Sequence, residues 1–337
     1  MRIGITGISG SLGTALLHAL TKDPNTVVVG STRDELKAEK LAGYGYQNSR
    51  IMVAAAGLSD PDTLTKIYDG CEILIHAAAL KRISESVYAA DEMVKTNIVG
   101  TMNMLKVARD IGAKKFVLIS SDKAVEATNL YGSAKFCAEC IAVQANAFLY
   151  PKGCSVVATR YGNVLGSRGS VVHIWREQAA HGKPLSITLK SMTRFILTLE
   201  QAIDMIRTAI YRAMPGDIVV PLLKAARMTD LAVAVMREAG RADMSAVENG
   251  LRPGGEKIHE SLLSREEIAR TFCTQSLGSI GCLLVEPSHP TWMDRSEQRR
   301  SGSSFPHAEY ASNLVERYDA DELQTLLKDV PVRSSVD

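Results

Sequence analysis

Four ionisable side chains lie within one short segment of the sequence, "SSDKAVEATNLYGSAK", residues 120–135. An acid and an amine, Asp122 and Lys123, are adjacent there. A phenol, Tyr131, precedes Lys135 by four positions, one turn of a helix. An ammonium near a phenol favours the phenolate, which can take a proton from a hydroxyl group. The segment predicts proton-transfer chemistry, with catalytic roles for Ser121, Asp122, Lys123, Tyr131 and Lys135.

A glycine-rich stretch near the N-terminus, "GITGISGSLG", follows a strand-like run and opens a helical pattern. Glycines there permit a tight turn and a close approach of the backbone to a pyrophosphate. The helix that follows offers free N–H groups to the phosphates. The pattern predicts a dinucleotide site, and the residues expected to contact the cofactor are Gly7, Ser9, Gly10, Ser11, Leu12 and Gly13.

The end of the second strand-like run indicates which dinucleotide binds. An NAD site usually has a carboxylate at this point, to hold the ribose 2′-hydroxyl. In "VVVGSTRDELK" hydroxyl groups and a guanidinium precede any acid, and both groups suit a 2′-phosphate. The alternative is that the Arg is only a surface cation. We predict NADP, contacted here by Thr32, Arg33, Asp34 and Lys37.

Strand-like and helical patterns alternate over the first 160 residues, so a parallel sheet with helices on both faces must position these groups. Such a sheet binds ligands outside the carboxyl ends of its strands. The predicted fold is α/β, a Rossmann-like doubly wound parallel sheet with a smaller C-terminal substrate-binding lobe. We expect an NADP-binding domain over 1–165, and over 166–337 mainly the lobe, with segments returning to the main domain. The strand-like runs are 2–6, 25–31, 50–55, 72–78, 115–120 and 154–160, and one continuous helical pattern covers 90–110.

Composition limits the kinds of partner, metal and cellular location that the sequence predicts. A formal net charge of +2 over 337 residues gives no reason to expect nucleic acid or a membrane surface. Cys137 and Cys140 form a C-x-x-C, but no second pair among the six cysteines has zinc spacing, so no metal site is expected. The sequence begins without a charged-then-apolar leader, and no apolar run approaches the roughly 18 residues that span a bilayer. These features predict a cytoplasmic protein.

The chain resembles an extended short-chain dehydrogenase/reductase. It is most similar to the UDP-N-acetylglucosamine 4,6-dehydratases of the polysaccharide-biosynthesis group, in particular the inverting branch of the pseudaminic acid pathway. The matching blocks run in family order from residue 4 to about residue 313. They include "TGISGSLG", "HAAALKR", "VKTNIVGT", "SSDKA", "NLYGSAK", "RYGNVLGSRGSVV", "MTRFILTLEQA", "RPGGEKIHE" and "YASN".

The resemblance implies dehydration of a UDP-sugar with NADP as cofactor. Oxidation of carbon 4 by Tyr131 and Lys135 makes the proton on carbon 5 acidic, and the 6-hydroxyl can then leave. Asp122 and Lys123 would be the acid and the base of that elimination. The hydride returns to carbon 6, with inversion at carbon 5 in this branch.

The resemblance also implies ligand contacts. Ala77, Ala78, Ala79 and Lys81 in "HAAALK" would face the cofactor. The residues expected at the UDP-sugar are Lys81, Asn163, Arg168, Thr193, Arg252 and Glu256. Two departures from the family pattern concern these sites, a second Gly in "RPGGEK" and Gly57 where relatives commonly place an Asp near the adenine. We expect a homo-oligomer.

Two alternatives remain open at this stage. A UDP-sugar 4-epimerase would share the Tyr–Lys oxidation but has no need of an Asp–Lys pair aimed at carbons 5 and 6. A non-catalytic NADP-binding sensor would keep only the cofactor site, and such proteins typically lack the catalytic Tyr.

Overall fold

The computed structural model describes residues 1–47, 49–81, 88–241, 243–251, 254–274, 277–288, 290–293 and 303–331, and for 44–47 only the backbone. Its largest element is a nine-stranded sheet. The strands follow in spatial order: β14 (Thr271–Thr274), β15 (Cys282–Val285), β10 (Ile218–Pro221), β6 (Ser155–Thr159), β5 (Lys115–Ile119), β4 (Ile73–His76), β1 (Arg2–Thr6), β2 (Val27–Thr32) and β3 (Ile51–Ala55).

The strands from β10 to β3 are parallel to their neighbours, whereas β15 and β14 are added in antiparallel pairs. The central parallel strands are almost entirely apolar and buried, as expected for a sheet covered on both faces. The strand order reverses between β1 and β4, and ligands of such sheets bind at that point, beyond the carboxyl ends of the strands.

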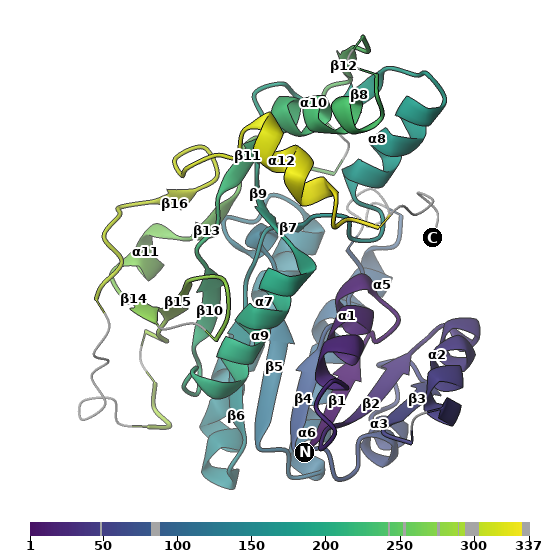
Figure 1. Cartoon of the computed structure of the whole chain (residues 1–337). Helices are drawn as coiled ribbons and strands as arrows, with labels where there is room; N and C mark the ends of the chain where they lie inside the picture. The colour runs from purple at the N-terminus through teal and green to yellow at the C-terminus, as the bar shows by residue number, and fades with distance from the viewer. Residues whose placement is uncertain are drawn as a thin grey trace.

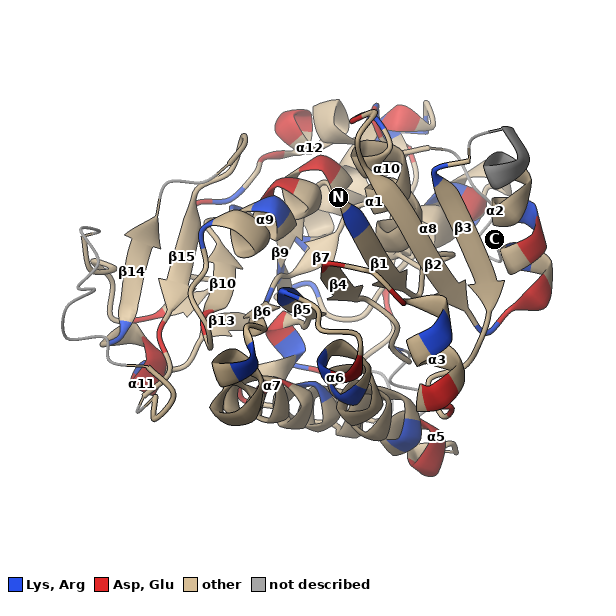
Figure 2. Ribbon diagram, turned by 90° about the horizontal axis from the view of Figure 1, so that it is seen from below, with Lys and Arg blue, Asp and Glu red and all other residues tan. Residues whose placement is uncertain are grey.

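Helices cover both faces of this sheet (Figures 1 and 2). On one face lie α1 (Ser11–Leu20) and α9 (Leu199–Tyr211). On the other lie α3 (Pro61–Ile67), α6 (Gly100–Asp110) and α7 (Leu130–Leu149). Beside β3 lies α2 (Glu35–Gln47). Figure 2 shows charges of both signs on outer helices such as α2 and α3.

A smaller lobe lies above the carboxyl ends of the parallel strands (Figure 1) and has its own apolar core around Trp175 and Leu231. Short sheets and turns connect it to the main sheet. Its elements are α8 (Val171–Ala180), β8 (Leu185–Ile187), α10 (Met228–Glu238), β12 (Ala246–Glu248) and α12 (Ala320–Leu327). The connecting elements are β7 (Asn163–Val164), β9 (Thr193–Leu197), β11 (Ala225–Arg227), β13 (Ser261–Leu263), α11 (Arg265–Ile268) and β16 (Tyr310–Ala311).

The predicted fold class is confirmed, with one refinement and one correction. The sheet is mostly rather than wholly parallel, because β15 runs antiparallel to both of its neighbours, β10 and β14. The continuous helical pattern of 90–110 is interrupted: α5 (Ala90–Val94) and α6 are joined by a π-helical turn, η1 (Lys95–Val99). None of the described helices is long and apolar enough to cross a membrane.

Candidate active site

The glycine-rich loop turns tightly between β1 and α1. The Gly10 N–H donates to the Gly7 carbonyl at 2.9 Å, and Gly10 then precedes the first turn of α1. Because Gly10 has no side chain that could cap the helix, the first N–H groups of α1 are left for another acceptor. Ser11, Leu12 and Gly13, which the sequence predicts at the cofactor, form this first turn.

The end of β2 lies against the same loop. The Thr32 hydroxyl is 2.8 Å from the hydroxyl of Ser9. The Asp34 carboxyl pairs with Lys37 Nζ at 2.9 Å, and hydrogen bonds from Lys37 lower the pKa of Asp34. Arg33 is exposed beside them. An acid is therefore present at the end of β2, but its negative charge is compensated by Lys37.

The segment after β4, which holds Ala77–Lys81, is fixed by an Asn from the π-helical turn. Asn97 accepts a hydrogen bond from the Leu80 N–H at 2.8 Å and donates to the Leu80 carbonyl at 2.9 Å. The Ala78 N–H donates to the Thr6 hydroxyl. π-Helical turns often mark functional sites because they redirect one side chain. Here Asn97 of the π-helical turn holds the segment that is expected to face the cofactor.

Arg168 contacts the glycine-rich loop, which the sequence did not predict. Its N–H donates to the Ser11 hydroxyl at 2.8 Å, and its guanidinium donates to the Ser9 carbonyl at 2.7 Å. Its carbonyl accepts from Lys81 Nζ at 2.8 Å. The loop before α8 is thereby joined to the glycine-rich loop. Expected at the sugar, Arg168 contacts the cofactor loop in this structure.

The acid–base pair lies beyond the carboxyl end of β5. Past Ile119 the chain keeps its pairing with the extension of β6, since the Asp122 N–H donates to the Tyr161 carbonyl at 2.9 Å. A short 3-10 turn, η2 (Asp122–Ala124), follows. The Asp122 side chain is fully buried, with its Oδ1 accepting from the Ser121 hydroxyl at 2.8 Å. Within the described part of the chain, its Oδ2 has no hydrogen-bond partner.

The Lys123 amine lies between two carboxyls. Its Nζ is 3.1 Å from Asp122 Oδ1 and 3.4 Å from Glu260 Oε1. Burial raises the pKa of Asp122, with a further rise from Glu260 that opposes the lowering by Lys123. Burial alone would lower the pKa of Lys123, but the carboxyls of Asp122 and Glu260 raise it above its usual value. The pKa of Asp122 is therefore raised, the direction that the expected role as an acid requires.

Tyr131 joins this group from the first turn of α7. The helix can approach because position 132 is a glycine: a Cβ there would lie 2.2 Å from the Lys123 carbonyl oxygen. Burial raises the pKa of Tyr131, while Lys123 and a hydrogen bond with Ser121 lower it. The buried Lys135 amine donates to the Ile119 carbonyl at 2.6 Å. The cation that favours the phenolate here is therefore Lys123, whereas the sequence predicts Lys135.

Residues expected at the sugar nucleotide lie on the lobe side. Asn163 is exposed in β7. Thr193 is 2% exposed, and its hydroxyl is engaged by His259 and Ser312. Glu256 pairs with Arg194 at 3.3 Å. In this structure Thr193 and Glu256 thus support the lobe, and Arg252 lies outside the described residues.

The second glycine of "RPGGEK" has a structural use. Gly255 has a φ of +88°, and a Cβ there would lie 2.6 Å from the Thr128 carbonyl oxygen. Its own carbonyl accepts from the side chain of Asn129, the N-cap of α7, at 2.8 Å. The extra glycine therefore packs this turn against the start of the helix that carries Tyr131.

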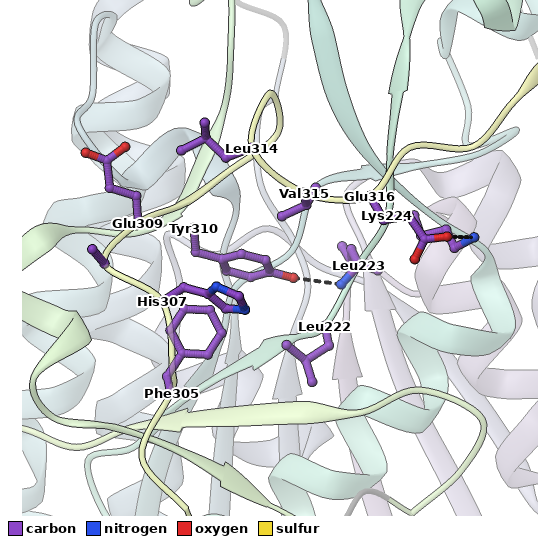
Figure 3. Close-up of a pocket in the computed structure, with 11 residues that line it drawn as sticks. Leu222, Leu223, Lys224, Phe305, His307, Glu309, Tyr310, Leu314, Val315 and Glu316 are labelled. Atoms are coloured by element: carbon purple, nitrogen blue, oxygen red, sulfur yellow. Dashed lines mark hydrogen bonds and ion pairs between the residues drawn. The ribbon is translucent and has the colours of Figure 1, made fainter.

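A cavity of about 720 Å³ opens elsewhere, between the end of β10 and the chain around β16 (Figure 3). Tyr310 crosses its floor, with its hydroxyl accepting from the Leu223 N–H at 2.7 Å. Lys224 and Glu316 pair at its rim. None of the acid–base residues lines it. We therefore place the chemistry at the buried group beyond β5, where the titratable side chains converge.

Sequence reasoning missed Arg194, Lys257 and Glu260 of this group, and Asn97 beside the segment after β4. All of them lie within or beside the quoted blocks "VKTNIVGT", "MTRF" and "RPGGEKIHE". A polar residue within a helical pattern marks Asn97. The spacing in "EKIHE" does not reveal which of its two acids turns inward, because that depends on the pairing of β13 with β16.

The order of the main sheet, the glycine-rich loop and the buried tyrosine and lysine define the class, an extended short-chain dehydrogenase/reductase. The model of the family described as "Polysaccharide biosynthesis protein" matches residues 3–279. The chain belongs to that family.

Relatives with two kinds of name are equally similar to this chain. An inverting UDP-N-acetylglucosamine 4,6-dehydratase of Campylobacter jejuni is 34% identical over 271 residues, 80% of this chain and 79% of its own. A UDP-glucose 4-epimerase of Rickettsia rickettsii is 34% identical over 276 residues, 79% of this chain and 78% of its own. The X-ray structure of Pen from Bacillus thuringiensis matches with a TM-score of 0.86 and 26% identity, over 99% of this chain and 98% of that chain.

Proposed function

We propose that the protein is an NADP-dependent UDP-sugar 4,6-dehydratase, and that UDP-N-acetylglucosamine is its substrate. The observation that carries this proposal is the buried Asp122–Lys123 contact of 3.1 Å beside Tyr131. Simple sugar oxidation and epimerisation need the phenol alone. A second acid and base in the same buried group suit the removal of a hydroxyl next to a carbonyl.

The proposed reaction assigns one proton movement to each side chain. Tyr131 takes the proton of the 4-hydroxyl as carbon 4 becomes a carbonyl. The amine of Lys123 takes the proton of carbon 5, and Asp122 gives its proton to oxygen 6, which leaves as water. The hydrogen lost as hydride from carbon 4 is returned at carbon 6, and the proton of carbon 5 is replaced. The product is a UDP-4-keto-6-deoxy sugar, with inversion at carbon 5.

Lys123 must be a neutral amine when it acts as the base. Transfer of one proton from Lys123 to Asp122 across their contact gives a carboxylic acid and an amine without any change of net charge. Exclusion of water by a bound sugar favours this neutral form, since isolated charges are poorly stabilised in a dry site. Ser121 hydrogen bonds to Asp122 and to Tyr131, so it lies on the route by which the proton of Tyr131 can return to Asp122.

NADP, when bound, supplies the acceptor and donor of the hydride. Thr32, Arg33 and Lys37 support a 2′-phosphate at the end of β2, and the first turn of α1 supports the pyrophosphate. The compensation of Asp34 by Lys37 makes room for an anion there. Affinity measurements with NADP(H) and NAD(H) test this assignment, which tighter NAD(H) binding would overturn.

A UDP-sugar 4-epimerase is the second candidate, because relatives of that name are as similar as the dehydratases. The buried pair and the unpartnered Asp122 Oδ2 favour dehydration, because rotation of a 4-keto sugar needs no proton donor at oxygen 6. The buried Tyr131 and Lys135 are unnecessary in a non-catalytic sensor.

One proton NMR time course with UDP-N-acetylglucosamine in deuterated water tests the proposal. Dehydration gives a product lighter by one water by mass spectrometry, with solvent deuterium at carbon 5 and its configuration visible in the spectrum. An unchanged mass with a new sugar would establish epimerisation instead.

A further inference from the structure

A second carboxyl faces the proposed base from the C-terminal half of the chain. Glu260 directly precedes β13 and is 1% exposed. Its Oε1 lies 3.4 Å from Lys123 Nζ, and Asp122 Oδ1 lies 3.1 Å from the same nitrogen. The proposed acid–base chemistry needs only one carboxyl beside this amine, so the second carboxyl calls for a separate explanation.

The position of Glu260 is fixed from several sides. Lys257 Nζ lies 2.8 Å from Glu260 Oε2, and it also donates to the Val125 carbonyl at 2.7 Å. The Glu260 N–H donates to the Ser312 hydroxyl, and the Glu260 carbonyl accepts from the Ser312 N–H. A side chain fixed in this way holds a constant geometry relative to Lys123.

Glu260 carries its negative charge. Burial alone would raise its pKa, but Lys123, Arg194 and Lys257 lower it below the usual value for a Glu. The titratable and charged groups around this cluster are Asp122, Lys123, Tyr131, Arg194, Glu256, Lys257 and His259. Within this set Glu260 raises the pKa of both Asp122 and Lys123.

We propose that Glu260 is a positioning residue of the acid–base pair. It holds the Lys123 amine against Asp122. Its fixed negative charge also keeps one proton on the Asp122–Lys123 pair while the sugar reacts. This inference rests on the proposed function. Nothing is transferred to Glu260 itself: the proton of carbon 5 goes to Lys123, the proton of Asp122 goes to oxygen 6, and Glu260 stabilises the resulting ammonium.

The test compares Glu260→Gln with the wild type and with Glu267→Gln. Gln has nearly the shape of Glu but no charge. Glu267 is a matched control, since it is also a buried Glu in an ion pair, 2.8 Å from Arg160. For each protein we would measure the formation of reduced nicotinamide in a single turnover, deuterium incorporation at carbon 5, and water loss as a function of pH.

In Glu260→Gln we expect hydride transfer within about twofold of the wild type, and deuterium incorporation and water loss slower by about tenfold or more. Both limbs of the pH profile of water loss should move to lower pH by roughly one unit, because the negative charge that raises both pKa values is gone. Glu260→Asp keeps the charge and should restore the wild-type limbs. Glu267→Gln should lower the melting temperature without moving either limb of the pH profile.

The inference would be overturned if Glu260→Gln had the rates and the pH profile of the wild type. It would also be overturned if hydride transfer and water loss were slowed by the same factor. If Glu260→Gln does not fold, Glu260→Asp carries the test. A slowed elimination with unmoved limbs in that variant supports the positioning, and wild-type behaviour in every respect refutes it. Absence of water loss from the wild type would instead overturn the proposed function, and this inference with it.

Discussion

Lys123 is the residue on which the proposed chemistry depends most directly, because its amine contacts both acids. Lys123→Ala should abolish water loss while the cofactor still binds, because the hydrogen bonds that hold the glycine-rich loop and the segment after β4 do not involve Lys123. The variant leaves the buried Asp122 carboxyl without its ion-pair partner, whereas Glu260 keeps Lys257, so it should also lose about 3–5 kcal/mol of stability. Mass spectrometry of the product, cofactor titration and thermal unfolding check the three expectations. Unimpaired water loss would refute the role of Lys123 as the base.

Tyr131 carries the hydride step in this proposal. Tyr131→Phe removes the proton acceptor but keeps the ring that fills the site, so hydride transfer should slow by about 10²–10⁴-fold. Cofactor affinity should change little. Stopped-flow absorbance of the reduced nicotinamide measures the rate, and a wild-type rate would contradict the assignment.

Lys135 gives the stability of the protein a pH dependence. Burial lowers the pKa of Lys135 to about 8, with Glu139 opposing the shift. An unfolded Lys keeps its proton up to a pKa of about 10.4, so the unfolded chain binds more protons than the folded one between these two values. We therefore expect the contribution of Lys135 to stability to rise as the pH increases from about 8. Lys135→Met carries no charge and should lose this rise in a series of melting temperatures against pH; an unchanged series would contradict the lowered pKa.

At the scale of elements, the π-helical turn between α5 and α6 links a helix to the cofactor segment. Asn97→Ala removes two hydrogen bonds to Leu80 and should cost about 1–3 kcal/mol of stability. It should also weaken cofactor binding, because the segment after β4 loses its support. Asn103→Ala is a matched control, since Asn103 also donates to a backbone carbonyl, that of Leu58.

Calorimetry and cofactor titration distinguish these two variants. Both should be less stable than the wild type, but only Asn97→Ala should bind the cofactor more weakly. Equal cofactor affinities in the two variants would mean that the π-helical turn has no part in the cofactor site.

At the scale of the whole molecule, Arg168 connects the lobe side of the chain to the glycine-rich loop of the main sheet. Arg168→Ala should weaken cofactor affinity by about tenfold, the effect of one lost charge-assisted hydrogen bond that orders the phosphate loop. The control is Arg237→Ala, which removes an exposed pair with Asp321. Isothermal titration with the cofactor measures both. If the two variants bind alike, the contact of Arg168 has no role in cofactor retention.

The sequence by itself determined the layered fold and the local chemistry. Alternating apolar runs and helical patterns specify a doubly wound sheet, because each element needs a buried face. Asp122 with Lys123, and Tyr131 with Lys135, are close in the chain and therefore close in space. Burial of the segment after β5 also follows from its place at the end of a central strand.

Only the tertiary structure decided which distant groups complete the site. Glu260 meets Lys123 from 137 residues further along the chain, and Arg168 meets Ser9 from 159 residues away. The same packing turns Thr193 inward and gives Lys135 a backbone carbonyl as partner. Pairing between distant segments depends on how strands and turns dock, and residue spacing carries no record of that docking.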